Sequence, residues 1–504
     1  MPEGSVLTFR RERIMKRDVQ CENPKNATGY RLLFDMRTLG TLIIAIVGII
    51  SFALPVRSAG PVNVPNPTVI GPIPALVPPG DPSHNYPFFS TTADLASYGY
   101  VEEEFFFEGT ANRYIISDPL TTATIRDGGH PYRTRMIVRR PSSADAFNGT
   151  VVLEWQNVAA GYDFDGAWIQ SSEHFMRRGY AWIGVSALRA GISQPVTGLK
   201  DWSPIRYATL DVTAGGTITN DDLAYDIFSQ AAQAVRNPIG VDPTGGLPVD
   251  LILAVGASAS AGKLVSYHNS IHPLAGVFDG FFVAAGGGKL RTDLESKVFK
   301  VSSETDVAGL SGGNQALLRQ PDSDHFRHWE VAGSAHLDFH VWQAIGPVRV
   351  RDLGPQTLPS CANPTFSRIP FYFVLNAAGD HLNNWVRYEI APPTAPEIEV
   401  VSFGSPNVIA RDDFGNALGG IRLSQLVVPT ATNTGLNSGP GFCRLYGTFE
   451  PFDEASIEAL YGNHGAYVNQ VARVTYDNLQ NGYLVPEDAD TTVREAAQSG
   501  TGKR

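Results

Sequence analysis

The segment VDLILAVGASASAGKLVSYHN, residues 249–269, decides the fold class. Residues 251–255 are apolar, which is typical of a short strand buried on both faces, and residues 261–269 follow a helical pattern. Between them lie five small residues with Ser258 at their centre. A strand that turns this sharply into a helix needs small residues beside the turn, because the two elements crowd each other there.

Strand and helix patterns alternate along the rest of the chain. Candidate strands lie at residues 132–141, 150–155, 180–187, 249–255, 278–286, 297–302 and 328–333. Candidate helices lie at residues 163–178, 221–236 and 261–269. The alternation predicts an α/β fold, in which a mostly parallel sheet carries helices on both faces. An insertion after strand 180–187, at residues 188–220, is too long for a simple connection, and we expect it to form a wall of a binding pocket.

The first 59 residues differ from the remainder and resemble a leader. Residues 39–54 carry no charge, follow a basic flank and precede the small residues Ser58 and Ala59, a pattern typical of a secretory signal peptide. The stretch is shorter than the roughly 20 residues of a membrane span. We expect a secreted or periplasmic protein, with an uncleaved membrane anchor as the alternative. Met36 directly precedes the basic flank, so residues 1–35 are either an over-extended gene start or a long basic region.

The chain after the leader divides by composition and pattern. We expect a proline-rich extended arm (60–93), an α/β core (94–345), a C-terminal elaboration packed on the core (346–490) and a tail (491–504). Within the elaboration, helical patterns recur around residues 382–390 and 452–479.

Charge and cysteine content limit the partners. The 504 residues include 39 Lys and Arg against 50 Asp and Glu, and the formal net charge is −11. With no long basic run in the body of the chain, nucleic acid is not an expected partner. Cys21 lies in the leader, which leaves Cys361 and Cys443 as a pair that suggests one disulfide in an oxidising compartment, or else two separate thiols. Oligomeric state stays open, and we expect no stable membrane association once the signal is cleaved.

Ser258 is the candidate nucleophile. A serine at the apex of a strand-to-helix turn projects from the backbone, where a base can take its proton and a substrate carbonyl can reach it. The usual turn has glycine two positions before and two positions after the serine; here Gly256 fits the pattern and Ser260 departs from it. An ordinary helix-capping serine is the alternative reading.

Partners for this serine follow later strands in the order that such an architecture requires. Strand 297–302 is followed by two carboxylates, Glu304 and Asp306, and strand 328–333 is followed by His336. The acid orients the imidazole, and the histidine takes and returns the serine proton. An oxyanion hole would use the backbone N–H of Ala259 and one from the loop after strand 150–155, for which Val158 is our candidate.

Four histidines crowd into sixteen residues and raise the possibility of a metal site. They are His325, His328, His336 and His340. Leu337 stands where the zinc-protease helix motif needs glutamate, so we expect no metal. His464 follows no predicted strand and is a weaker candidate base. Asp163 and Asp165 are expected to begin a helix favourably for its dipole.

The chain resembles α/β-hydrolases, and more narrowly the bacterial group of exported α/β-hydrolase-domain proteins. The resemblance rests on GASASAGKL, SSETDV, WEVAGSAHLD, PIRYATL with DDLAYDIFSQA, and GNALGGIRL with VPTA, and it covers most of residues 95–490. It implies hydrolysis of a carboxylic ester or a related acyl bond without a cofactor. In the general α/β-hydrolase pattern the acid stands a few residues beyond the strand, which favours Asp306 over Glu304.

These observations predict an exported serine hydrolase with Ser258, Asp306 and His336 as its triad and a small-molecule ester or amide as its substrate. Three alternatives remain: an amidase or an acyltransferase that uses the same triad, and a binding protein that keeps the hydrolase scaffold without activity.

Overall fold

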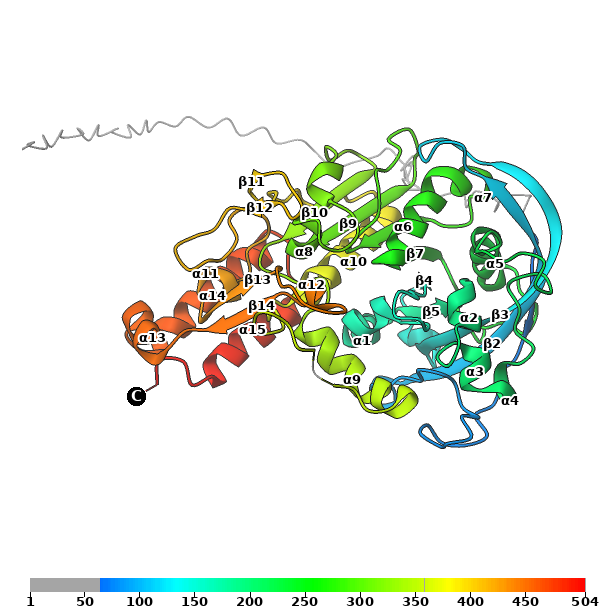
Figure 1. The fold of residues 1–504 in the computed structure, drawn as a ribbon, viewed down its shortest axis with the longest axis horizontal. Coiled ribbons are helices and arrows are strands. Elements are labelled where there is room, and N and C mark those ends of the chain that lie inside the picture. Colours follow the sequence, from blue (N-terminus) through cyan, green and yellow to red (C-terminus); the bar gives the residue numbers. More distant parts are fainter. Residues whose placement is uncertain (1–63, 358, 504) are drawn as a thin grey trace, which may run out of the picture. The chain divides into compact units, whose positions relative to one another are not determined.

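The computed structural model describes residues 64–357 and 359–503 (Figure 1). The predicted leader, with its apolar stretch at 39–54 and the cleavage site beside Ala59, lies outside the described residues. Within the described ranges, no helix has both the length and the apolar character needed to cross a bilayer.

A ten-stranded sheet forms the centre of the fold, in the order β10-β9-β8-β7-β4-β5-β3-β2-β1-β6. The strands are β1 (Thr68–Ile70), β2 (Tyr100–Ile115), β3 (Thr124–Pro141), β4 (Thr150–Trp155), β5 (Ala181–Val185), β6 (Ile239–Gly240), β7 (Leu251–Ala257), β8 (Gly280–Ala284), β9 (Lys297–Ser303) and β10 (Phe326–Val331). From β10 to β5 all neighbours are parallel, whereas β5, β3, β2 and β1 pair antiparallel. The predicted α/β fold with a mostly parallel sheet is confirmed.

Helices cover both faces of this sheet, and the residues of β7 show how. Ile252 and Ala254 pack into one apolar cluster with α5 (Ala224–Arg236) and α6 (Ala259–Ser266). Leu253 and Val255, which point the other way, pack with α1 (Gly166–Arg178) and α10 (Phe371–Tyr388). A strand buried on both faces has no polar side to display, which explains the continuous apolar run in the sequence.

Strand β2 is a long strand that the sequence pattern did not predict. It pairs over most of its length with β3, and the two form the curved ribbon at one side of Figure 1. Three consecutive glutamates, residues 102–104, interrupt the apolar pattern that would have indicated a strand. Each is neutralised from β3, as Glu102 is by Arg139 directly opposite at 2.7 Å and Glu103 by Arg140 at 2.7 Å.

The region after residue 338 adds helices that fit the predicted boundaries only in part. The boundary at 345 falls inside α9 (Phe339–Leu353), and the boundary at 490 falls inside α15 (Pro486–Gln498). The pattern near 382–390 is the end of α10, which is far longer. The single helix expected at 452–479 is two, α13 (Glu454–Tyr461) and α14 (His464–Gln480), because Gly462 ends the first with a φ of 67°.

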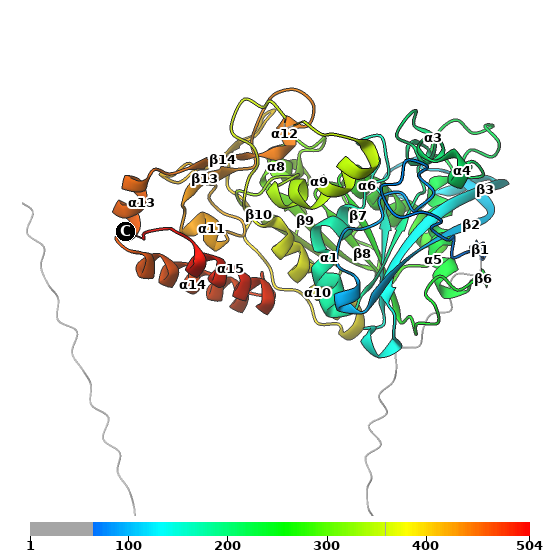
Figure 2. The ribbon, with the colours of Figure 1, turned by 90° about the horizontal axis from the view of Figure 1, so that it is seen from below.

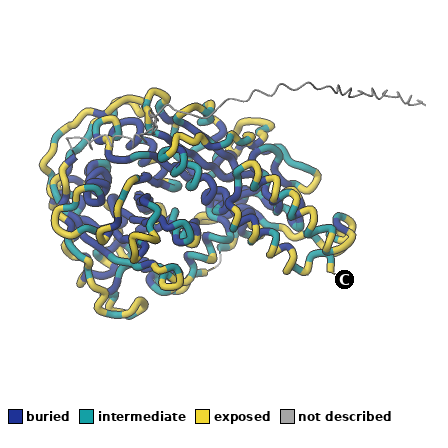
Figure 3. The backbone as a smooth tube through the Cα atoms, turned by 180° about the vertical axis from the view of Figure 1, so that it is seen from behind, coloured by how far each residue is buried: buried dark blue, intermediate teal, exposed yellow. Residues whose placement is uncertain are grey.

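Short elements complete this region. They are α11 (Ser424–Val427), α12 (Cys443–Tyr446) and the pairs β11 (Val400–Ser402) with β12 (Val408–Ile409) and β13 (Ala431–Thr434) with β14 (Thr448–Pro451). Figure 2 shows α13, α14 and α15 grouped at the opposite end from β1 and β6. They form a small apolar cluster of their own, and Figure 3 shows their backbone mostly exposed or half-buried.

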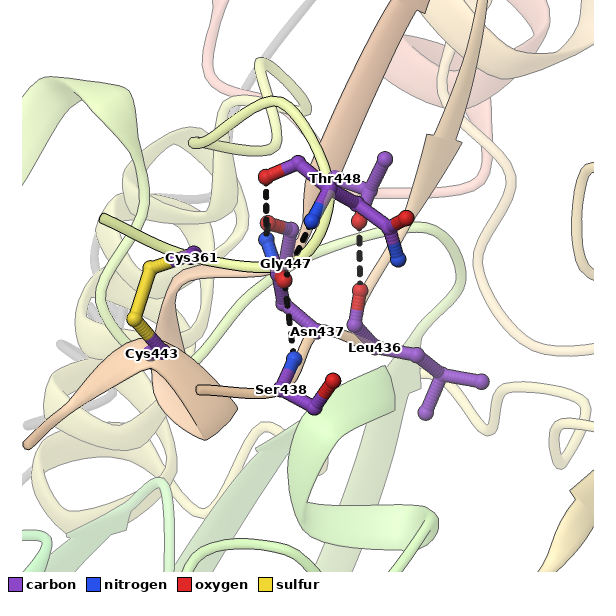
Figure 4. Close-up of a disulfide and its surroundings, with 8 residues drawn as sticks. Cys361, Leu436, Asn437, Ser438, Cys443, Gly447 and Thr448 are labelled. Atoms are coloured by element: carbon purple, nitrogen blue, oxygen red, sulfur yellow. Dashed lines mark hydrogen bonds between the residues drawn. A yellow bond between two sulfur atoms is a disulfide. The ribbon is translucent and has the colours of Figure 1, made fainter. Parts of the chain in front are cut away.

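A disulfide joins Cys361 to Cys443, with their Cα atoms 5.4 Å apart (Figure 4). The suggested bridge is therefore present. Beside it, the Asn437 side chain donates to the carbonyls of Gly447 at 2.8 Å and Asn363 at 3.2 Å. Together these links fix α12 to the loop before α10.

The insertion after β5 packs on the β2–β3 side of the sheet through a buried ion cluster. It folds into the short helices α2 (Arg189–Ser193), α3 (Leu199–Trp202) and α4 (Pro204–Tyr207). Glu104 of β2 is 1% exposed and accepts hydrogen bonds from Arg135 at 2.5 Å, Arg206 at 2.6 Å and the Tyr207 hydroxyl at 2.7 Å. One carboxylate thus holds two buried guanidinium groups from different parts of the chain.

We predict that Glu104→Ala lowers the free energy of unfolding by about 3–5 kcal/mol, because it leaves two buried cations without their partner. The neighbouring Glu103→Ala is the control, since Glu103 is partly exposed and pairs with Arg140 alone, and it should cost about 1 kcal/mol or less. Chemical denaturation of the two purified variants measures both values. Equal losses would contradict the role given to Glu104.

Candidate active site

Ser258 occupies the sharp turn between β7 and α6. Its backbone is left-handed (φ 58°, ψ −121°), and its N–H donates to the carbonyl of Ala284 on β8 at 3.0 Å. A Cβ added at Gly256 would lie 2.7 Å from the carbonyl oxygen of Ser260, so only glycine fits there. The turn therefore presents the serine hydroxyl beyond the ends of the parallel strands.

Ser260, the departure from the usual glycine, has its own function in the turn. Its hydroxyl donates to the Ala257 carbonyl at 2.8 Å and accepts the Ala257 N–H at 3.0 Å. Glycine could make neither bond. The buried hydroxyl satisfies both backbone groups of the residue just before Ser258 and so stiffens the turn.

A continuous hydrogen-bonded chain runs from Ser258 through His336 to Asp306. His336 Nε2 lies 2.8 Å from Ser258 Oγ, and its Nδ1 lies 2.7 Å from Asp306 Oδ1. The backbone N–H of His336 donates to the Thr305 hydroxyl at 3.1 Å, which fixes the histidine loop against the acid's own segment. The three residues singled out from the sequence are therefore in contact, in the order nucleophile, base, acid.

Asp306 is held as a buried carboxylate at the start of α8 (Glu304–Val307). Its second oxygen, Oδ2, accepts the N–H of Ser303 at 2.8 Å and the hydroxyl of Ser303 at 2.6 Å. Burial opposes ionisation, but the nearby His336 and the hydrogen bonds to the carboxylate outweigh it and hold the pKa of Asp306 below its usual range.

Glu304 faces away from His336, although only one residue separates it from Asp306. The chain turns into a helix here, so the two carboxylates do not point the same way. Glu304 binds Arg411 at 2.7 Å, the N–H of Gly333 at 2.7 Å and the N–H of Gly435 at 3.1 Å. It thereby braces the turn that leads to His336.

The two N–H groups expected to form an oxyanion hole are both free. In the loop after β4, the N–H groups of Gln156, Asn157 and Ala159 donate to acceptors, whereas that of Val158 donates to none among the described residues. The N–H of Ala259, in the first turn of α6, also has no acceptor within the described ranges. The Asn157 side chain, which the sequence did not single out, donates to the Ala257 carbonyl at 2.8 Å and ties this loop to the serine turn.

Two apolar lobes meet at Ser258 and His336. The first encloses about 930 Å³ with its mouth included and runs between the sheet and helices α1 and α10. The second encloses about 720 Å³, is more open, and is lined by α9, α12 and their neighbours, with Trp342, Phe366, Phe442 and Tyr446 among its aromatic residues.

The expectation that residues 188–220 wall the pocket is wrong: no residue of this insertion lines either lobe. Several of its apolar residues, among them Leu199 and Tyr207, are buried in the core instead. The pocket walls come from α1 and from the C-terminal region, whose contribution had no local sequence signal.

The other histidines and acids singled out from the sequence have separate partners. His325 lies near Lys297 and Glu295, His328 bonds to Ser302, His340 bonds to the Ile169 carbonyl, and His464 bonds to the carbonyls of Thr501 and Ala497. Within the described ranges, no group of three or more His, Cys, Asp or Glu side chains gathers as a metal site would require. Asp165 precedes α1 but makes no cap; it binds Arg139 at 2.7 Å, and Asp163 binds Ser186.

Comparison with known proteins gives one family match and several distant structural likenesses. A family model described as "Alpha/beta hydrolase domain" matches residues 70–494. No curated protein matches the chain. XC6422 from Xanthomonas campestris, described as an a/b serine hydrolase without lid, is 14% identical over 50% of this chain and 97% of its own, with a TM-score of 0.27. Esterase Est22 is 12% identical over 51% and 79% of the two chains, with a TM-score of 0.29. A fungal esterase of Rhizomucor miehei is 11% identical over 55% and 84%, with a TM-score of 0.28.

Asp338, two residues after His336, supports a prediction on pH. It begins α9 by accepting the Val341 N–H at 3.0 Å, and burial raises its pKa to about 7 despite such backbone hydrogen bonds. The folded protein therefore keeps a proton that the unfolded chain releases, so this residue lowers stability as pH rises from about 4 to 7.

Asp338→Asn should keep the helix cap and remove this loss. The variant's free energy of unfolding should exceed that of the wild type by a margin that grows from pH 4 to pH 8, to at most about 4 kcal/mol. Denaturant titrations at several pH values measure the margin. A constant difference across that range would contradict the assignment.

Proposed function

The chain belongs to the alpha/beta hydrolase family, and on that premise we propose that it is a serine hydrolase that cleaves a carboxylic ester through an acyl-enzyme on Ser258. The observation that carries the proposal is the unbroken set of hydrogen bonds from Ser258 Oγ to His336 and on to Asp306, at 2.8 and 2.7 Å. A nucleophile, its base and the group that orients the base need this arrangement.

In the proposed mechanism, His336 Nε2 takes the Ser258 proton as Oγ attacks the ester carbonyl. Asp306 keeps Nδ1 protonated and stabilises the imidazolium that forms. The N–H groups of Val158 and Ala259 receive the oxyanion. His336 then returns the proton to the departing alcohol, and a water activated by the same histidine releases the acid from Ser258.

An amidase or an acyltransferase would use the same residues. The two differ from an esterase in the group that leaves or attacks, so a panel of esters, amides and acceptor alcohols separates these activities. A scaffold without catalysis would turn over none of them.

We also infer that the protein is exported and secreted or periplasmic. Support comes from the signal-like residues 39–54 and from the disulfide between Cys361 and Cys443, because such bonds persist in oxidising compartments.

Loss of the triad should abolish turnover while the fold survives. We predict that Ser258→Ala reduces hydrolysis of a short-chain aryl ester to the residual rate left by binding and the oxyanion hole, and that Asp306→Asn lowers kcat by a factor on the order of 10⁴. Both changes remove chemistry and little packing, so the thermal transition of Ser258→Ala should stay close to that of the wild type. Purified variants assayed on one ester give these values.

Glu304→Gln is the matched control, because Glu304 is as buried as Asp306 but does not touch His336. It should lose stability, since Arg411 loses its charged partner, and it should retain far more activity than Asp306→Asn. A crippled Glu304→Gln beside an active Asp306→Asn would reassign the acid. Near-normal turnover by Ser258→Ala would overturn the serine mechanism.

Export predicts a mature chain that begins close to Ala59 or Gly60. N-terminal sequencing of protein from the native host, after separation of soluble and membrane fractions, tests this directly. A chain that starts at residue 1 or 36 and is recovered in the membrane fraction would favour the anchor instead.

A further inference from the structure

The first lobe is a long channel rather than a shallow cleft. It begins at Ser258 and follows β7 back along the sheet from Ala257 through Val255 to Leu253. Four residue steps along a strand cover about 13 Å. On the opposite wall, α1 lines it from Ala167 to His174, about 10 Å of helix.

One face of α10 forms the rest of the channel wall. Phe371, Leu375 and Leu382 line it at helical spacing, and Gly379 stands in the same row. A Cβ added at Gly379 would meet no atom within 4 Å, so the glycine leaves open the space that a larger side chain would fill. The gap lies toward the end of the channel that is farther from Ser258, beside Leu382.

The far end of this apolar channel carries a buried polar side chain. His174 is 2% exposed, lines the channel, and donates from Nε2 to Asp380, which lies 3.0 Å away and also accepts the Tyr180 hydroxyl at 2.9 Å. His174 Nδ1 is buried and has no hydrogen-bond partner in the described chain, and neither has Gln170 Oε1, one helical turn nearer to Ser258. In a neutral imidazole whose Nε2 proton is directed at Asp380, Nδ1 is an acceptor.

We propose that the channel binds the acyl chain of the substrate, a linear chain of roughly eight to ten carbons by the length of the channel, and that a hydroxyl near the far end of that chain donates to His174 Nδ1. The inference rests on the proposed ester hydrolysis at Ser258 and adds the substrate class, esters of medium-chain hydroxy acids. An unpaired buried acceptor at the end of an apolar channel favours a ligand that brings a donor there.

The acyl chain, and not the alcohol, suits the more enclosed lobe. The acyl group stays bonded to Ser258 after the first step, whereas the alcohol must leave before water can attack. The second lobe is more open, and Phe442 on its wall is 38% exposed, which gives the alcohol a way out.

The test uses p-nitrophenyl esters of straight-chain acids from acetate to palmitate, together with the 10-hydroxydecanoate ester. For the wild type, kcat/KM should rise to a maximum near decanoate and fall by tenfold or more at palmitate. The 10-hydroxydecanoate ester should exceed the decanoate ester by roughly fivefold to tenfold, the value of one hydrogen bond to an otherwise unpaired acceptor.

Two variants test the two parts of the channel. Gly379→Leu should lower kcat/KM for decanoate about tenfold or more relative to kcat/KM for acetate. Gly346→Leu is its control, because Gly346 is also a glycine within a helix, its added Cβ also meets nothing, and it lines neither lobe. His174→Phe should remove the preference for the hydroxylated ester, whereas His340→Phe, on α9 and outside both lobes, should keep it.

The outcomes separate this inference from the proposed function. Acetate turnover with a flat or falling chain-length profile in the wild type would overturn the acyl channel and leave the esterase standing. A chain-length maximum without a hydroxyl preference, or a preference that survives in His174→Phe, would overturn the polar terminus. Failure of the wild type on every ester would overturn the proposed function, and this inference with it.

Discussion

Ser258 holds a left-handed backbone between β7 and α6, a conformation that costs a residue with a side chain about 1–3 kcal/mol. Its surroundings leave it no alternative. Gly256 permits the close approach of the helix, the Ser260 hydroxyl bonds to both backbone groups of Ala257, and the Ser258 N–H is held by β8. The parallel centre of the sheet sustains the strain. The Ser258 hydroxyl and the N–H of Ala259, which has no acceptor in the described ranges, therefore occur together at one end of the strands.

Asp306 and Glu304, separated by one residue, support His336 in different ways. Asp306 contacts the imidazole, while Glu304 binds Arg411 and the N–H of Gly333, three residues before His336, and so restrains the histidine loop. Thr305 between them accepts the His336 N–H and donates to the Gly435 carbonyl. Glu304 and Thr305 therefore connect the histidine loop to the C-terminal region, so that region is part of the site's framework.

The elements that follow from local pattern could be predicted, and those that depend on distant partners could not. β7 is a continuous apolar run, β4 is apolar apart from Thr150 and Glu154, and the order of Ser258, Asp306 and His336 follows from the strands that precede them. β2 escaped prediction because its glutamates are neutralised by arginines distant in the sequence, on β3 and, for Glu104, also on α4. The walls of the pocket could not be predicted because α9 and α10 form them only by packing on the sheet. The 188–220 insertion misled for the same reason: its length suggested a pocket wall, while the buried bonds of Arg206 and Tyr207 to Glu104 hold it against β2.

The sheet restricts where substrate preference can be set. Along β7, Val255 and Leu253 face the first lobe, while Ala254 and Ile252 between them fill the core under α5 and α6. A change of backbone position there would disturb both faces, because the interior is close-packed. Helices α1 and α10 also present small residues to the lobe, Ala167, Ser171 and Gly379, and α1 departs from helical geometry at Ser171. The catalytic groups therefore follow strands whose backbone cannot move. The shape of the pocket depends on helices whose small residues can be substituted one at a time without altering the position of Ser258.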